Sequence, residues 1–239
     1  MAKEVGNIEF VKIYLKQWLS EMQDENACVT WNISSAWTNT HLSILYKLAF
    51  ELGYCCEDRD TAKKENYAKT VQQEYYQVDF SLYRHIKNSY WNLDYAIEHE
   101  NEKYNITKNR VYKGWFDEFA KLLPLKCRKA RVVIGYDYFD CENLDNSFER
   151  KIENCLNLLN DKDVQQSTAE SPILLIIFPG GKKMKQILQG EDSSILRVVE
   201  FTCKHDGNSQ NWYQTELTDR VIDQNLKENL VKSYRLIKG

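Results

Sequence analysis

Three acidic residues in two strand-like segments are the side chains of this chain best suited to chemistry. Asp79 lies in segment 74–83, and Glu98 and Glu100 lie in segment 93–101; both segments are rich in Tyr, Val, Phe and Ile. A hairpin turning at 88–89 places Asp79 opposite Glu98, with Cβ atoms about 4.5–5.5 Å apart, and Glu100 diagonal to Asp79. Carboxylates so placed repel one another unless a cation such as Mg²⁺ lies among them. The spacing therefore predicts a divalent-cation site suited to phosphodiester hydrolysis.

The elements around these segments predict a chain that alternates between helix and strand. Apolar residues at three- and four-residue spacing indicate helices, and short continuous apolar runs indicate buried strands. The expected helices are 7–22, 40–52, 112–126, a helix opened by the capping box Asn146 to Glu149, 182–189, and one from 222 onward; the expected further strands are 131–136 and 172–179, with a last hairpin at 195–202 and 212–217. We expect an α/β fold, a central mixed β-sheet flanked by helices, in a single domain over 1–239.

The acids and their neighbouring elements together resemble the PD-(D/E)xK nuclease superfamily, whose fold is that of restriction endonucleases. That family's core is a helix, a hairpin carrying the acids, a second helix and another strand. The corresponding segments here are 40–52, 74–101, 112–126 and 131–136. Val78-Asp79 stands for the family's first acidic motif, and Glu98-His99-Glu100 stands for the second. The resemblance covers about 40–140, and 141–239 would complete the sheet and carry specificity or dimer contacts.

Two positions depart from the family pattern. Val78 stands where the family often has Pro, and Glu100 stands where it usually has Lys. Some restriction enzymes of the family do have Glu-x-Glu at this position. By that resemblance, Glu100 would act as a metal ligand or as a base. A lysine that orients the attacking water would then come from Lys103, Lys113 or Lys121.

The resemblance implies a Mg²⁺-dependent DNA endonuclease of the type II restriction class, with Mn²⁺ as a substitute. Asp79 and Glu98 would bind the metal, and Glu100 would join them in catalysis. Cutting both strands would require a homodimer with one site per strand. Besides the three lysines named above, a basic run after strand 172–179 offers phosphate contacts: Lys182, Lys183 and Lys185.

Several alternatives remain open from the residues alone. The acids are also compatible with the solvated face of a sheet in an unrelated α/β protein. A catalytically inactive relative acting as a nucleic-acid-binding or assembly module is the rival that Glu100 favours. Alternation puts Asp94 on the same face as Ala96 and Glu98, but about 13 Å from Glu98. Asp94 is therefore expected to be a surface residue, or to replace Asp79 in the site if the register differs. His99 is expected to pack on the opposite face, and Glu51 to be a solvated helix residue or a further acid near the metal.

Composition limits the cellular setting and the kind of partner. The chain has 239 residues, 43% of them apolar, a net charge of −3 and a pI near 5.9, which excludes a globally basic nucleic-acid binder. No run approaches the roughly 18 apolar residues of a membrane span, and the first residues lack a signal-peptide core. Seven cysteines without a Cys-x-x-Cys pair are typical of reduced thiols. We therefore expect a cytoplasmic protein that does not bind a membrane.

Overall fold

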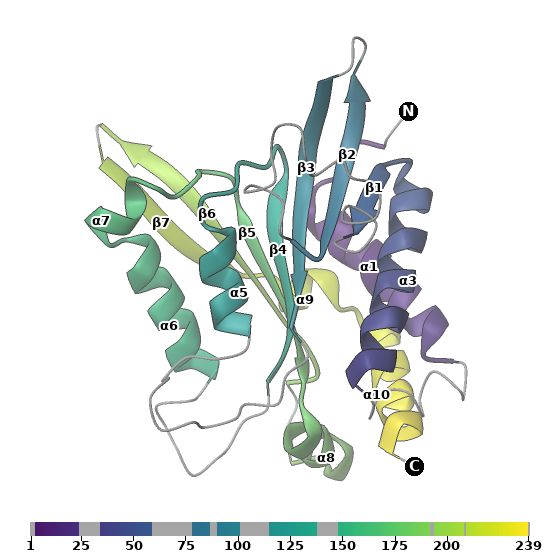
Figure 1. Cartoon of the computed structure of the whole chain (residues 1–239). Helices are drawn as coiled ribbons and strands as arrows, with labels where there is room; N and C mark the ends of the chain where they lie inside the picture. Colours follow the sequence, from purple (N-terminus) through teal and green to yellow (C-terminus); the bar gives the residue numbers. More distant parts are fainter. Residues whose placement is uncertain are drawn as a thin grey trace.

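A seven-stranded sheet with helices on both faces forms the frame of the molecule (Figure 1). The computed structural model describes residues 3–23, 34–58, 78–86, 90–100, 115–137, 148–191, 194–207 and 209–238. The strands are β1 (Cys55–Asp58), β2 (Phe80–Ile86), β3 (Tyr90–His99), β4 (Ala130–Asp137), β5 (Ile173–Pro179), β6 (Arg197–Asp206) and β7 (Ser209–Glu216).

The strands lie side by side in the order in which they occur along the chain, from β1 to β7. Strands β3, β4 and β5 are parallel to one another, and every other neighbouring pair is antiparallel. The expected α/β fold with a mixed sheet flanked by helices is therefore confirmed. No helix in the described part of the chain has the length and apolar character needed to cross a membrane.

The helices form two layers, one on each face of the sheet, and each layer packs against the sheet through its own apolar core. One layer contains α1 (Asn7–Glu21), α3 (Ser34–Leu52), α8 (Gly181–Gln189), α9 (Thr218–Val221) and α10 (Gln224–Lys238). The other contains α5 (Trp115–Leu122), α6 (Phe148–Leu159) and α7 (Lys162–Gln165). Figure 1 shows α5, α6 and α7 on the side of the sheet opposite α1, α3 and α10.

The hairpin β2–β3 has the register that the sequence predicts at its open end. Phe80 pairs with Ile97, so Asp79, which directly precedes β2, comes opposite Glu98. The connection is longer than the expected two-residue turn, since Ile86 pairs with Tyr90.

A β-bulge compensates for this longer connection. Leu82 pairs with Tyr95 but the next residue, Tyr83, pairs with Leu93, so Asp94 is an extra residue on β3. The bulge turns Leu93 towards the core under α5, which also contains Ala96, while Tyr95 packs in the other core. The expectation that Asp94 shares a face with Ala96 and Glu98 was therefore wrong, because simple alternation fails at a bulge.

Other differences concern where elements begin and end. Helix α3 begins at Ser34 rather than at 40, and α5 ends at Leu122 rather than at 126, while residues 112–114 of the expected helix lie outside the described residues. Strand β1 was not expected, because its four residues show no apolar alternation and become a strand by pairing with β2. Residues 74–77 of the first strand-like segment lie outside the described residues.

Candidate functional site

Glu98 is a fully buried carboxylic acid on β3, on the face that α5 covers. Glu98 is paired with Val133 of β4, and its side chain is 1% exposed. Among the described residues, neither carboxylate oxygen has a hydrogen-bond partner of good geometry. An acid without hydrogen bonds is expensive to bury in its charged form, so the position requires either a proton or a cation.

Asp79 lies next to Glu98 at the start of β2. Its Oδ2 atom accepts a hydrogen bond from the backbone N–H of His99, at 3.0 Å, so the side chain reaches across to β3. This contact fixes the carboxylate close enough to Glu98 for its charge to act on the Glu98 carboxyl. The hairpin thus brings together the two acids that the sequence analysis assigned to a metal.

Lys121 of α5 supplies a positive charge to the same place. Its Nζ atom lies 2.5 Å from Glu98 Oε1 and 3.2 Å from Glu118 Oε2, and its side chain is 36% exposed. Lys121 was one of three lysines considered for this role. Lys103 and Lys113 lie outside the described residues.

Burial and the negative charge of Asp79 raise the pKa of Glu98 to about 9, although Lys121 acts in the opposite direction. Burial also opposes the charge of Lys121, but the Glu98 and Glu118 carboxylates raise the pKa of Lys121 above its ordinary value. Because Lys121 is partly exposed and Glu98 is not, burial decides the state of the carboxyl group. The raised pKa therefore favours the protonated form of Glu98 at neutral pH.

The pair of carboxylates fits a hard cation, which prefers oxygen ligands. A divalent ion beside Glu98 and Asp79 would replace the missing hydrogen bonds and remove the repulsion between the two acids. In the described ranges, however, no group of three or more His, Cys, Asp or Glu side chains could hold a metal ion. The described site is therefore a pair of acids rather than the expected group of three.

Glu100 follows two residues later, directly after β3. Its N–H donates to Ile134 O at 2.9 Å, which extends the pairing of β3 with β4, and the residue is half-buried. Alternation along the chain directs it to the same face as Glu98.

His99 packs on the opposite face of the sheet, as expected. Its ring stacks on that of His41 from α3, with centroids 3.8 Å apart, and meets the edge of Tyr136 at 6.0 Å. Burial lowers the pKa of His99 to about 4 and that of His41 well below its usual range, so both rings are neutral at pH 7. Nothing in the local sequence indicated the partnership with His41, because only the fold brings α3 to β3.

Two other acids do not belong to this site. Asp94 is completely buried and bonded to Arg84, Arg128 and Tyr54, so it is neither a surface residue nor a substitute for Asp79. The carboxylate of Glu51 accepts a hydrogen bond from Gln17 Nε2 at 2.5 Å on the outer side of α1 and α3. It therefore serves as a link between two helices and not as a further acid beside Glu98.

The basic residues of α8 follow the carboxyl end of β5, towards which β3 also runs. Because β3, β4 and β5 are parallel, their carboxyl ends point the same way, but Glu98 is level with Val133 and Leu175, and β5 continues to Pro179 before α8 begins. Lys182 is in the first turn of α8, Lys183 is half-buried, and Lys185 is exposed. In open α/β sheets, ligands bind outside the carboxyl ends of the strands.

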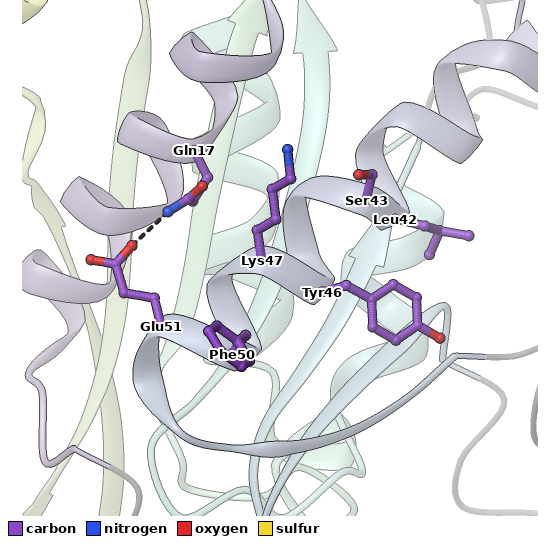
Figure 2. A pocket seen from close by; sticks show the side chains of 7 residues that line it. All are labelled: Gln17, Leu42, Ser43, Tyr46, Lys47, Phe50 and Glu51. Carbon is purple, nitrogen blue, oxygen red and sulfur yellow. Dashed lines mark hydrogen bonds between the residues drawn. The ribbon is translucent and has the colours of Figure 1, made fainter.

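The surface hollow shown in Figure 2 lies elsewhere, on the outer side of α3. It measures about 770 Å³, and its lining includes Tyr46, Lys47, Phe50 and Glu51 but neither Asp79 nor Glu98. Glu51 points towards Gln17 of α1, while Phe50 is 89% exposed. The hollow contains no paired acids in a buried setting, so the chemistry of the chain is better sought at Glu98.

Searches against protein-family models, curated proteins and solved structures found no match to this chain.

Proposed function

We propose that this protein is a Mg²⁺-dependent DNA endonuclease with a restriction-endonuclease-like fold. The observation that carries the proposal is the pairing of buried Glu98 with Asp79 and Lys121, two acids and a cation at the carboxyl edge of β3. A protein gains little stability from burying one acid beside another, and such perturbed groups are concentrated at functional sites.

The order of elements supports the same proposal. Helix α3 is followed by β1, β2 and β3 in antiparallel succession, then by α5, and then by β4, which is parallel to β3. The nuclease core to which the sequence was compared has this sequence of a helix, a hairpin with the acids, a helix and a strand. The acids lie in the hairpin, as the resemblance requires.

Each residue of the site has a separate role in the proposed reaction. Asp79 and Glu98 would hold a Mg²⁺ ion, which lowers the pKa of a bound water and offsets the charge of the scissile phosphate. Lys121 takes the part of the lysine that is missing at position 100, and its ammonium group would bind a phosphate oxygen. Glu100 is the further acid available to accept a proton from water. Lys182, Lys183 and Lys185 would contact the DNA backbone, and two copies of the chain would cut both strands.

Cleavage of supercoiled plasmid DNA tests the proposal. We expect nicking or linearisation with Mg²⁺ or Mn²⁺ and none with EDTA. Glu98→Gln should lower the rate by about 10²-fold or more, since it removes a metal ligand, whereas the matched control Glu153→Gln, an exposed residue of α6, should retain it. Wild-type protein that leaves supercoiled, linear and single-stranded DNA intact with both metals would refute the nuclease assignment.

A catalytically inactive nuclease-fold protein that binds nucleic acid or supports an assembly is the second candidate. It is favoured by the ammonium of Lys121, which lies against Glu98 where a metal would bind, and by the absence of a third ligand within the described segments. This candidate predicts DNA binding in a fluorescence-anisotropy titration that is insensitive to Mg²⁺, together with no cleavage.

A further inference from the structure

Two arginines converge on the buried carboxylate at the β3 bulge. Arg84 Nε donates to Asp94 Oδ2 and Arg128 Nε donates to Asp94 Oδ1, both at 2.8 Å. Tyr54 donates its hydroxyl to the same Oδ2 atom at 2.9 Å. Asp94 is 0% exposed, so both guanidinium groups are held by an acid that cannot move into solvent. Their planes are fixed before any ligand arrives.

One further nitrogen of each arginine is directed at the same exposed carboxylate. Arg84 Nη1 lies 2.9 Å and Arg128 Nη2 lies 3.1 Å from the same oxygen, Oε1 of Glu4. Glu4 is 66% exposed, and the hydrogen bond from Arg128 together with the charges of Lys129, Arg84 and Arg128 lowers the pKa of its carboxyl group. Without Glu4, the two guanidinium groups would share the single negative charge of Asp94, which leaves one positive charge for another anion to balance.

Glu4 belongs to the short segment before α1, not to a helix or strand. The segment is attached to the end of α3 by a hydrogen bond from Lys3 N to Leu52 O, at 2.8 Å. Arg84 Nη2 makes a longer contact, 3.4 Å, with Lys3 O. These contacts leave the Glu4 side chain exposed and replaceable by another anion without any change in the sheet.

We propose that Arg84 and Arg128 form a phosphate-binding site in which the Glu4 carboxylate is an internal occupant that a phosphate group displaces. The paired N–H donors of a guanidinium group bind the oxygens of a phosphate as well as those of a carboxylate. A phosphate group offers three oxygens and more negative charge than the Glu4 carboxylate. Because the guanidinium groups are already oriented by Asp94, little side-chain freedom is lost on binding.

This site is independent of the pair formed by Asp79 and Glu98. Asp94 is four residues from Glu98 along β3, roughly 13 Å at the rise of a strand, and lies beyond the bulge that changes the face. Phosphate binding at Arg84 and Arg128 therefore does not depend on the proposed nuclease activity. Glu98→Gln should leave it unchanged.

Calorimetric titration with inorganic phosphate at low salt tests the site. We expect Glu4→Ala to bind phosphate at least tenfold more tightly than wild type. Glu9→Ala, an exposed acid in the first turn of α1, makes the same change in net charge and should bind like wild type. Equal affinities of Glu4→Ala and Glu9→Ala, or no binding by Glu4→Ala, would overturn the proposal.

A second pair of variants locates the bound phosphate. In the Glu4→Ala background, Arg128→Ala should abolish binding, whereas Arg150→Ala, which removes a surface arginine of α6, should not. Retained affinity in the Arg128→Ala protein would refute the site. Displacement of phosphate by a short DNA duplex would identify its source as a nucleic-acid backbone, and phosphate that a duplex does not displace would identify a small phosphorylated compound; both results support the site itself.

Discussion

Glu98 carries its carboxyl group in a place where the charged form is poorly solvated. Neither oxygen receives a well-aligned hydrogen bond from the described residues, and Asp79 adds a negative charge nearby. Lys121 offsets part of this cost from a position at the edge of the site. The free protein therefore holds a proton on Glu98, and a divalent cation would compete with that proton.

The raised pKa has a consequence for stability. In the folded protein the pKa of Glu98 is about 9, whereas its ordinary value is 4.5, so the folded state binds the extra proton between these pH values. The contribution is fully present below pH 4.5 and is lost as pH rises towards 9, at up to about 1.4 kcal/mol for each pKa unit. With EDTA present, wild type should lose stability relative to Glu98→Gln from pH 5 to pH 9. Urea unfolding at pH 5, 7 and 9 measures this, and parallel pH profiles of the two proteins would contradict it.

The presence of acids at 79 and 98 was predictable, but their surroundings were not. Period-two alternation and a guess at the turn were enough to place Asp79 opposite Glu98. The role of Asp94 was not predictable, because its partners Arg84, Arg128 and Tyr54 come from other parts of the chain and because it lies at a bulge, where alternation fails. Buried ion pairs between distant segments leave no periodic signal in a sequence.

Among the helices and strands, the position of α5 on the sheet determines whether Lys121 can reach Glu98. Gly135 in β4 makes this close approach possible, since a Cβ atom there would lie 2.7 Å from Trp115 Cβ. Trp115 Cβ is near the backbone and cannot move away by a simple rotation. The helix as a whole would have to shift.

Gly135→Ala should therefore destabilise the protein by about 1–3 kcal/mol, the usual cost of overpacking a core. It should also weaken the contact of Lys121 with Glu98 and so alter the pH dependence described above. Gly6→Ala is a suitable control, because a Cβ at Gly6 meets no atom within 4 Å. Equal unfolding free energies of the two variants in urea would show that α5 does not depend on Gly135.

Arg131 attaches the end of α5 to the segment that leads into β5. It is 0% exposed and donates to Leu123 O at 2.5 Å and to Ala169 O at 2.7 Å, with a further short contact to Ser171 O. Burial lowers the pKa of Arg131 to about 10, so it remains charged at neutral pH.

Arg131→Met should cost about 3 kcal/mol or more, because several buried carbonyl groups would lose a charged donor. Arg150→Met removes an exposed arginine paired with Glu153 and should change stability by less than about 0.5 kcal/mol. The two midpoints of thermal unfolding provide the comparison. A shift of the same size in both variants would show that the carbonyl contacts contribute nothing.

Strands that are buried on both faces were predictable from the sequence. A strand that depends on hydrogen bonds to its neighbour was not. Strands β4 and β5 are continuous apolar runs because both faces are buried, and they begin and end within a residue or so of expectation. Strand β1 has the sequence Cys-Cys-Glu-Asp and depends on β2 for its hydrogen bonds, so composition alone gave no signal. Helix α3 likewise begins at Ser34, before the apolar spacing that predicted a helix from residue 40.

Across the complete fold, the sheet separates two charged centres. The acids Asp79 and Glu98 lie at the carboxyl end of β3, whereas Arg84 is paired with Asn92, nearer the start of that strand, and Arg128 and Asp94 lie near the start of β4. One centre suits a cation and the other suits an anion. Both would serve the proposed nuclease, and each can be tested alone.

Calorimetric titration of the protein with Mn²⁺ at pH 7, in two buffers with different ionisation enthalpies, tests whether Asp79 and Glu98 bind a cation. Since metal ligands must lose their protons, wild type should bind Mn²⁺ and release about one proton per ion, the proton of Glu98. Glu98→Gln should bind at least tenfold more weakly and release none. Equal affinity and equal proton release in both proteins, or no Mn²⁺ binding by wild type, would contradict a metal site at this pair.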